Sequence, residues 1–142
     1  MYPKIICHMI TSVDGRLIAE RWTPGYDGKK LEDFVNIYFE LHKKFDAAGW
    51  INGRKTVQRH YFPKTFDTTG TVPAVNPQTY IAPRETKSLM AVIDPMGKIF
   101  YEGNKIEGDN IVAILSEQVS DRYLEHLHDM NISYLFCRCG RM

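Results

Sequence analysis

Short apolar segments of strand length alternate with segments of helical periodicity along this chain, and this alternation constrains the fold more than any other feature. Apolar runs of this length, bounded by turn residues, are typical of β-strands. A continuous apolar run such as 110–116 indicates a strand covered on both faces. Strands are predicted at residues 4–10, 48–52, 89–94, 110–116 and 132–136, with a brief further strand at 79–82.

Three helices are predicted between these strands. The first has apolar residues at three- and four-residue spacing, which is the pattern of a helix with one buried face. The second follows the strand at 48–52, covers residues 54–60 and ends before Pro63. The third begins at Ser120 and Asp121, which can cap a helix, and ends near Asn131. The apolar positions of the first helix are Leu31, Phe34, Val35, Tyr38, Leu41 and Phe45.

This order of elements predicts an α/β domain with a largely parallel sheet and helical crossovers. Such sheets bind ligands at the carboxyl ends of their strands. A chain of 142 residues is long enough for one domain with a real core and too short for a second.

The composition indicates which classes of partner and which cell compartment to expect. A net charge of +1 with interspersed acids and bases gives no basic stripe for nucleic-acid phosphates. No apolar stretch approaches the roughly 20 residues that span a bilayer, and the first twelve residues do not form a signal peptide. Three cysteines, an odd number, fit a reducing compartment. We therefore expect a cytoplasmic protein with neither a nucleic-acid nor a membrane partner.

The turn after the strand at 48–52 is a candidate anion site. Gly53 leaves room for a phosphate near the backbone, and the amides at a helix start favour negative charge. Arg54 offers a planar fork, Lys55 a point charge and Thr56 a hydroxyl donor. An ordinary strand-to-helix turn with solvated bases explains these residues equally well.

Three segments, in order, resemble known reductases. Gly53-Arg54-Lys55-Thr56 looks like the stretch of dihydrofolate reductases that binds the phosphates of NADPH. Segment 10–16, Ile-Thr-Ser-Val-Asp-Gly-Arg, is similar to a signature of the reductase domain in riboflavin-biosynthesis deaminase-reductases, and segment 90–97, Met-Ala-Val-Ile-Asp-Pro-Met-Gly, also resembles part of that domain. The chain thus resembles the dihydrofolate reductase-like superfamily, and is closest to this riboflavin-type domain.

The resemblance implies a three-layer sandwich around a mostly parallel mixed sheet, with NADPH as cofactor. The activity it implies is reduction of a pyrimidine- or pterin-like heterocycle, most similar to 5-amino-6-(5-phosphoribosylamino)uracil reductase. It assigns no catalytic residue. The cofactor-binding residues it implies are Ile10 and Thr11 at the nicotinamide, Gly53, Arg54, Lys55 and Thr56 at the phosphates, and Asp94 and Pro95 near the adenosine ribose.

Candidate substrate-binding residues are His8, Asp14 and Arg16. His8 stands where riboflavin-type reductases often carry a lysine that meets the substrate phosphate, and histidine neither reaches as far nor stays charged at neutral pH. Its alternative role is a strand histidine bonded to a neighbour. Asp14 before Gly15 is first a turn former. Arg16 fits a solvated loop arginine as well as a phosphate ligand.

Two further features bear on function. Metal binding is not expected, because His126 and His128 point to opposite sides of a helix and Cys137 and Cys139 make only half of a four-ligand site. The chain ends before the last helix, strand and Gly-Gly turn of related domains, so we expect a domain lacking its C-terminal part, with an open sheet edge that favours a homodimer. The alternatives to an active reductase are a catalytically silent remnant and a nucleotide-binding interaction module.

Overall fold

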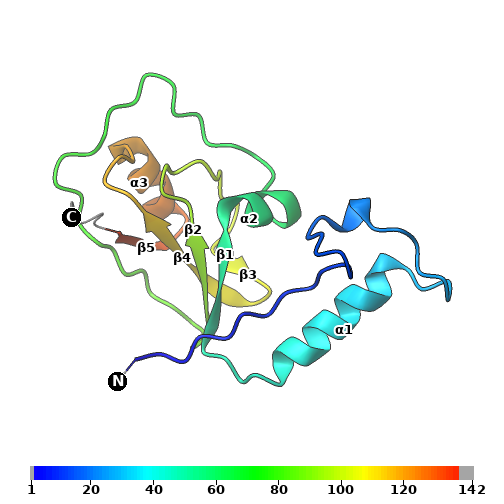
Figure 1. Cartoon of the computed structure of the whole chain (residues 1–142). Helices are drawn as coiled ribbons and strands as arrows, with labels where there is room; N and C mark the ends of the chain where they lie inside the picture. The colour runs from blue at the N-terminus through cyan, green and yellow to red at the C-terminus, as the bar shows by residue number, and fades with distance from the viewer. Residues whose placement is uncertain (1, 138–142) are drawn as a thin grey trace. The chain divides into compact units, whose positions relative to one another are not determined.

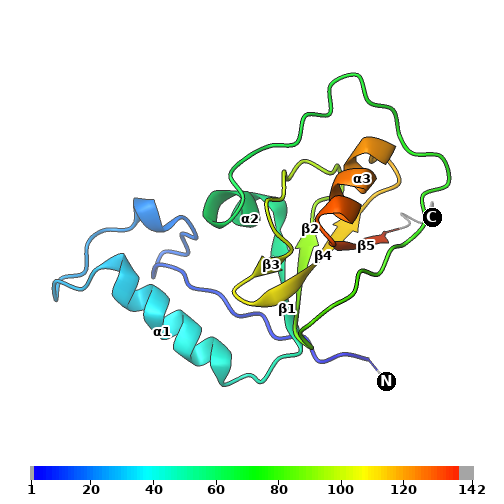
Figure 2. The same cartoon turned by 180° about the vertical axis from the view of Figure 1, so that it is seen from behind.

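The computed structural model describes residues 2–137 and shows two compact units, Met1–Ala47 and Ala48–Met142. Figures 1 and 2 show the chain from two opposite sides, with one long helix in the first unit and the sheet in the second. The prediction of an α/β protein with a mostly parallel sheet is confirmed. Among the described residues, no helix combines the length and apolar character needed to span a membrane.

The first unit contains the 3-10 helix η1 (Ala19–Arg21) and the helix α1 (Leu31–Lys43). The helix predicted from apolar periodicity is confirmed. Lys30 is the N-cap that precedes its first residue, and the Lys30 backbone N–H donates to the Asp33 side chain at 2.8 Å. Glu32 and Asp33 in the first turn, and Lys43 in the last, have the charges that the helix dipole favours at each end.

The strand predicted at 4–10 is wrong. This segment forms no strand, and among the described residues no backbone pairs with it in a ladder. The apolar side chains of Ile5 and Met9 are 81% and 56% exposed. A β-branched apolar run favours a strand only where a neighbouring strand accepts its hydrogen bonds and a core buries one face, and this run has neither.

The second unit is built on a five-stranded sheet. Parallel pairing joins β1 to β2, β2 to β4 and β4 to β5, and β3 pairs antiparallel with the start of β4. The predicted strands at 48–52, 89–94, 110–116 and 132–136 are confirmed with ends shifted by one residue. The strands are β1 (Gly49–Gly53), β2 (Leu89–Ile93), β3 (Lys105–Ile106), β4 (Asp109–Leu115) and β5 (Ser133–Phe136).

Two features of the sheet were not foreseen in this form. β3 is a two-residue strand joined to β4 by Glu107 and Gly108, whose φ angles of 49° and 88° are those of a tight type I′ hairpin. The strand predicted at 79–82 is reduced to an isolated bridge between Tyr80 and Tyr134. This bridge adds a single rung beside β5.

Both helices of this unit begin where the sequence predicts. α2 (Arg54–His60) follows β1 directly, and α3 (Asp121–Asp129) is capped by Ser120, whose side chain accepts a hydrogen bond from the backbone N–H of Tyr123. Asn131 follows α3 with a φ of 53°, a left-handed conformation that asparagine tolerates. The capping residues named from the sequence are therefore confirmed.

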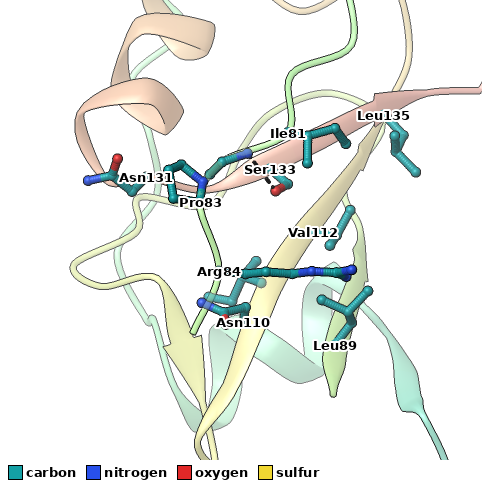
Figure 3. Close-up of a pocket in the computed structure, with 11 residues that line it drawn as sticks. Ile81, Pro83, Arg84, Leu89, Asn110, Val112, Asn131, Ser133 and Leu135 are labelled. Atoms are coloured by element: carbon teal, nitrogen blue, oxygen red, sulfur yellow. Dashed lines mark hydrogen bonds between the residues drawn. The ribbon is translucent and has the colours of Figure 1, made fainter. Parts of the chain in front are cut away.

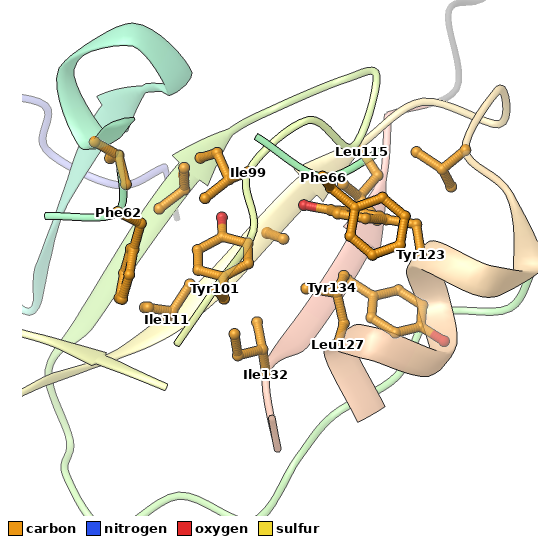
Figure 4. Packing of buried hydrophobic residues seen from close by; sticks show 14 of the residues in the cluster. Phe62, Phe66, Ile99, Tyr101, Ile111, Leu115, Tyr123, Leu127, Ile132 and Tyr134 are labelled. Carbon is orange, nitrogen blue, oxygen red and sulfur yellow. The ribbon is translucent and has the colours of Figure 1, made fainter. Parts of the chain in front are cut away.

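One face of the sheet forms the core together with α2 and α3. Its side chains pack in one cluster with Val57 of α2. Figure 4 shows Leu127 of α3 and the aromatic rings of the connecting segments in the same cluster. The strand register puts these side chains on one face because alternate residues point to the same side. The buried apolar residues on the strands are Met90, Val92, Ile106, Ile111, Ala113, Leu115 and Tyr134.

The opposite face of the sheet is also apolar but much less covered. Ile51, Ile93 and Leu135 are 64%, 45% and 38% exposed, and Ala91 and Val112 between them are half-buried. Within the second unit, the described helices both pack on the other face. The unit by itself therefore has two layers, a sheet and its helices.

Candidate functional site

The carboxyl ends of β1 and β2 lie side by side and carry the candidate anion site. Gly53 pairs with Ile93 in the parallel register, so Arg54 and Asp94 each follow the end of neighbouring strands. Parallel sheets bind ligands at such ends. The structure thus brings the segment 53–56 together with Asp94 and Pro95.

Gly53 leaves open space at the start of α2. It precedes the helix with an extended backbone, φ −79°, and no side chain caps the helix. A Cβ atom placed on Gly53 would meet no heavy atom within 4 Å. The glycine is therefore not required by packing within the protein, and its backbone is accessible to a ligand.

Arg54 is held at this turn by two neighbours. Its Nη1 donates to Oε1 of Gln58 at 2.5 Å, and its Nε lies 3.8 Å from Oδ1 of Asp94. The Arg54 side chain is 32% exposed, so part of the guanidinium reaches solvent. The fork is oriented by its neighbours while donors remain free for an anion.

Lys55 and Thr56 complete the turn. Both are exposed, and neither side chain forms a hydrogen bond or an ion pair with another residue in the described part of the chain. Their ammonium and hydroxyl groups are therefore available as donors to an anion beside Arg54.

Asp94 has a structural role in the turn after β2. Its carboxylate is fully buried, and Oδ2 accepts hydrogen bonds from the backbone N–H groups of Lys98 and Ile99 at 2.7 and 2.9 Å. The hydroxyl of Tyr123 donates to the same oxygen at 3.2 Å. Oδ1 has no hydrogen-bond donor among the described residues. The carboxylate fixes the turn, and its contact with a cofactor ribose stays a prediction.

The buried side chains of Tyr101 and Tyr123 lie near the Asp94 carboxylate. Burial raises the pKa of Tyr101 and of Tyr123, and the charge of Asp94 raises both further. Both tyrosines are therefore neutral at physiological pH, and Tyr123 acts as a hydrogen-bond donor. The hydroxyl of Tyr101 has no hydrogen-bond partner among the described residues.

His8 lies in the first unit and packs against α1. Its Nε2 atom is 3.1 Å from the backbone oxygen of Tyr38, and its ring stacks on the Tyr38 ring with centroids 4.1 Å apart. The ring of Phe45 meets it edge-on at 5.0 Å. These contacts match the alternative of a histidine bonded to a neighbour.

Asp14 and Arg16 form one local structure in the same unit. Nε of Arg16 lies 2.7 Å from Oδ2 of Asp14, and the backbone N–H of Gly15 donates to the Ser12 oxygen at 2.9 Å. Gly15 has a φ of 78°, which closes the turn and favours glycine. Asp14 lies within this turn, where its carboxylate accepts a hydrogen bond from the Ser12 hydroxyl and pairs with Arg16, and substrate contact by Asp14 or Arg16 stays a prediction.

The remaining cofactor candidates of the first unit are Ile10 and Thr11. Ile10 is half-buried and Thr11 is exposed, and both precede the turn at Asp14. The structure groups the site residues as Asp14 with Arg16 in one unit, and 53–56 with Asp94 and Pro95 in the other.

Sequence reasoning missed three residues at the candidate site, Gln58, Tyr101 and Tyr123. Gln58 could have been found, because residues four apart on a helix are neighbours. Tyr101 and Tyr123 reach Asp94 only through tertiary packing, which no local pattern reports. The contact of Gln58 with Arg54 is local to α2, whereas the positions of the two tyrosines beside Asp94 depend on the assembled unit.

His126 and His128, the two histidines considered as metal ligands, each contact a different tyrosine. Nε2 of His126 accepts the backbone N–H of Tyr101 at 3.1 Å, and Nε2 of His128 lies 3.0 Å from the Tyr134 hydroxyl. Within residues 2–137, no group of three or more His, Cys, Asp or Glu side chains could hold a metal ion. Cys139 lies outside the described residues.

Comparison with known proteins yields no relative. No protein-family model matches the chain, and searches of curated proteins and of solved structures find no significant match.

Proposed function

We propose that the chain is an NADPH-dependent reductase of a pyrimidine- or pterin-like heterocycle, with the dihydrofolate reductase-like three-layer sandwich as its fold. One observation carries the proposal. The open turn at Gly53 and the end of β2 are adjacent at the carboxyl edge of a parallel sheet, which is where α/β proteins bind nucleotide cofactors.

The donors at this edge suit a phosphorylated cofactor. Arg54 presents a partly exposed guanidinium, and Lys55 and Thr56 add two free donors within one helical turn. We place at these three donors the adenosine 2′-phosphate, which NADPH carries and NADH lacks, because such donors favour a dianionic phosphate over the neutral 2′-hydroxyl of NADH. The preference expected from this chemistry is for NADPH over NADH.

The proposed reaction adds a hydride and a proton across a carbonyl or imine bond of the heterocycle, and bound NADPH supplies the hydride. The protein's residues bind and orient the reactants. Ile10 and Thr11 would face the nicotinamide, and Asp94 and Pro95 the adenosine ribose. His8, Asp14 and Arg16 would contact the substrate.

A fluorescence titration tests the cofactor. We expect NADPH emission to change on addition of the full chain, and NADH to bind at least ~10-fold more weakly, the ratio that about 1.4 kcal/mol gives. Arg54→Gln should remove this preference, whereas Lys44→Gln, which changes an exposed cation in the turn after α1, should leave it intact. Equal binding of both cofactors would reject the phosphate assignment.

A turnover assay separates the reductase from its alternatives. Consumption of NADPH with a diaminopyrimidine substrate supports the enzyme. Binding of NADPH without turnover indicates a catalytically silent remnant. Stabilisation of the chain by ATP as much as by NADPH in thermal unfolding indicates a general nucleotide-binding module.

The sheet edge also supports a homodimer. β1 is the edge strand on one side of the sheet, and among the described residues no strand pairs with its outer edge. The strand Gly49–Gly53 contains no charge and no proline, the residues that protect exposed edges from pairing. We propose that two copies pair through this edge.

A further inference from the structure

A groove crosses the less covered face of the sheet at the amino ends of β2 and β4. Figure 3 shows its residues. Leu89, Val112 and Leu135 form an apolar floor from three neighbouring strands, and the segment 81–84 forms one wall. The groove has a volume of about 120 Å³, below the roughly 300–1,000 Å³ of sites for drug-sized ligands, so it suits only a small ligand that leaves part of its surface in solvent.

One charged side chain lines this groove. Arg84 is exposed and extends across the strands between Val112 and Leu89 (Figure 3). It forms no ion pair or hydrogen bond with another described residue. The adjacent carboxylate, Glu85, is 2.5 Å from Nζ of Lys105. The groove therefore has a cation without a counter-ion above an apolar floor.

The wall that carries Arg84 is fixed to the sheet. The backbone N–H of Ala82 donates to Oγ of Ser133 at 3.0 Å, drawn as a dashed line in Figure 3. Thr86, on the other side of Arg84, donates its backbone N–H to the Asn110 side chain at 3.2 Å. Arg84 thus lies between two anchored points, and the hydroxyl of Ser133 keeps its own proton to donate.

We propose that this groove binds a small carboxylate with an apolar chain. Its carboxylate would pair with the Arg84 guanidinium, and its chain would cover Leu89, Val112 and Leu135. A planar guanidinium matches a carboxylate with two parallel hydrogen bonds, and burial of an alkyl chain on an apolar floor is favourable. The ligand supplies what the groove lacks, a counter-ion and apolar cover.

The groove is separate from the proposed cofactor site. Leu89 begins β2 and Asp94 follows its last residue, so the two sites lie at opposite ends of that strand, roughly 16 to 17 Å apart at about 3.3 Å per residue. A second copy seated face to face on the groove would bring two Arg84 side chains together without a counter-ion. Charge therefore favours an anionic ligand over self-association on this face.

Nuclear magnetic resonance of the ¹⁵N-labelled full chain tests the proposal with sodium octanoate and uncharged 1-octanol as probes. We expect octanoate to shift the amide signals of Leu89, Val112 and Leu135 in a saturable manner, and octanol to bind about tenfold more weakly. Arg84→Gln should weaken octanoate about tenfold, and Arg84→Lys, which keeps the charge, should weaken it less.

The control is Lys87→Gln, an exposed cation outside the groove lining, which should bind octanoate as the unaltered chain does. Equal affinity for octanoate and octanol would overturn the proposal, as would unchanged octanoate binding by Arg84→Gln. Shifts of these amides that depend on protein concentration without octanoate would indicate a second copy and would also overturn it. Because Arg84 is exposed, the unfolding temperature of each variant should stay unchanged and confirm that the chain is folded.

Discussion

Nε of Arg54 lies 3.8 Å from Oδ1 of Asp94, and this carboxylate oxygen has no hydrogen-bond donor among the described residues. The other oxygen accepts two backbone N–H groups and the Tyr123 hydroxyl. One buried carboxylate thus joins the start of α2 to the turn after β2. It links the candidate anion site to the stability of the unit.

Asp94→Ala should therefore destabilise the protein strongly. It leaves the backbone N–H groups of Lys98 and Ile99 without their acceptor, and each lost buried hydrogen bond costs roughly 1–3 kcal/mol. We expect the free energy of unfolding in urea to fall by about 3 kcal/mol. The matched variant Tyr123→Phe removes one hydrogen bond of the same group and should cost about 1 kcal/mol. A smaller loss for Asp94→Ala than for Tyr123→Phe would contradict this assignment.

Gly53→Ala should weaken NADPH binding with little effect on the stability of the protein. The space around Gly53 is open and its φ is −79°, so alanine fits. The gain of up to about 1 kcal/mol from a more restricted unfolded chain is opposed by a similar loss at the N-cap of α2, where alanine is poorer than glycine, so stability should change by less than about 1 kcal/mol. A methyl group in the path of a phosphate should nevertheless weaken NADPH by about tenfold or more. Gly103→Ala, also in open space, is the control for both measurements. Unchanged NADPH binding by Gly53→Ala would place the phosphates elsewhere.

The β1–Gly53–α2 turn was predicted from the sequence because its signals are local. An apolar strand, a glycine and a helical segment follow one another directly, and residues 54–60 form the helix as expected. The parallel order of the sheet follows from the alternation of strands and helices. The absence of a strand at 4–10 could not be foreseen in the same way. A segment forms a strand only with a partner strand, and its own residues do not specify that partner.

The contacts of Asp94 also could not be predicted from the sequence, because they come from residues far along the chain. The sequence placed this aspartate at the end of a strand, which is correct, but could not show that Tyr123, on a helix 29 positions later, donates to it. Nor could it show that the carboxylate would be fully buried. Long-range packing, rather than the strand pattern, decides these contacts.

Gly97→Ala should be far more destabilising than Gly108→Ala. Both glycines have positive φ, 61° and 88°, which costs an alanine roughly 1–2 kcal/mol. A Cβ on Gly97 would also lie 2.6 Å from Cδ1 of the buried Tyr123, whereas one on Gly108 would meet no atom within 4 Å. Overpacking of this kind adds about 1–3 kcal/mol. Chemical denaturation of the two variants should show this difference, and equal losses would refute the close packing at Tyr123.

His126 should make stability fall in mild acid. Its Nε2 accepts the backbone N–H of Tyr101, which requires the unprotonated nitrogen. Burial lowers the pKa of His126 below its ordinary value of 6.5, and the nearby charge of Asp129 offsets part of this effect. The unfolded chain then binds the proton more readily, so the stability is fully present above pH 6.5 and is lost as pH falls from there toward the lowered pKa.

Thermal unfolding between pH 7.5 and pH 5 measures this effect. We expect the unfolding temperature of the unaltered chain to decrease below roughly pH 6.5. His126→Gln, whose side-chain oxygen can accept the same N–H, should show a smaller decrease. His60→Gln is the control, because His60 is exposed on α2. A pH profile that His126→Gln leaves unchanged would show that another group titrates.

Ile51→Lys should dissociate the proposed homodimer. Ile51 lies at the centre of β1, the unpaired edge of the sheet, and its side chain is 64% exposed. A lysine there puts a charge on the edge strand and disfavours pairing with a second copy. Light scattering at micromolar concentration should give a dimer for the unaltered chain and a monomer for Ile51→Lys. Ile81→Lys changes an apolar residue of the same exposure, 64%, outside the named strands, and should remain a dimer. If the unaltered chain is already monomeric, the open edge does not serve self-association, and the absence of charge in β1 must then have another cause.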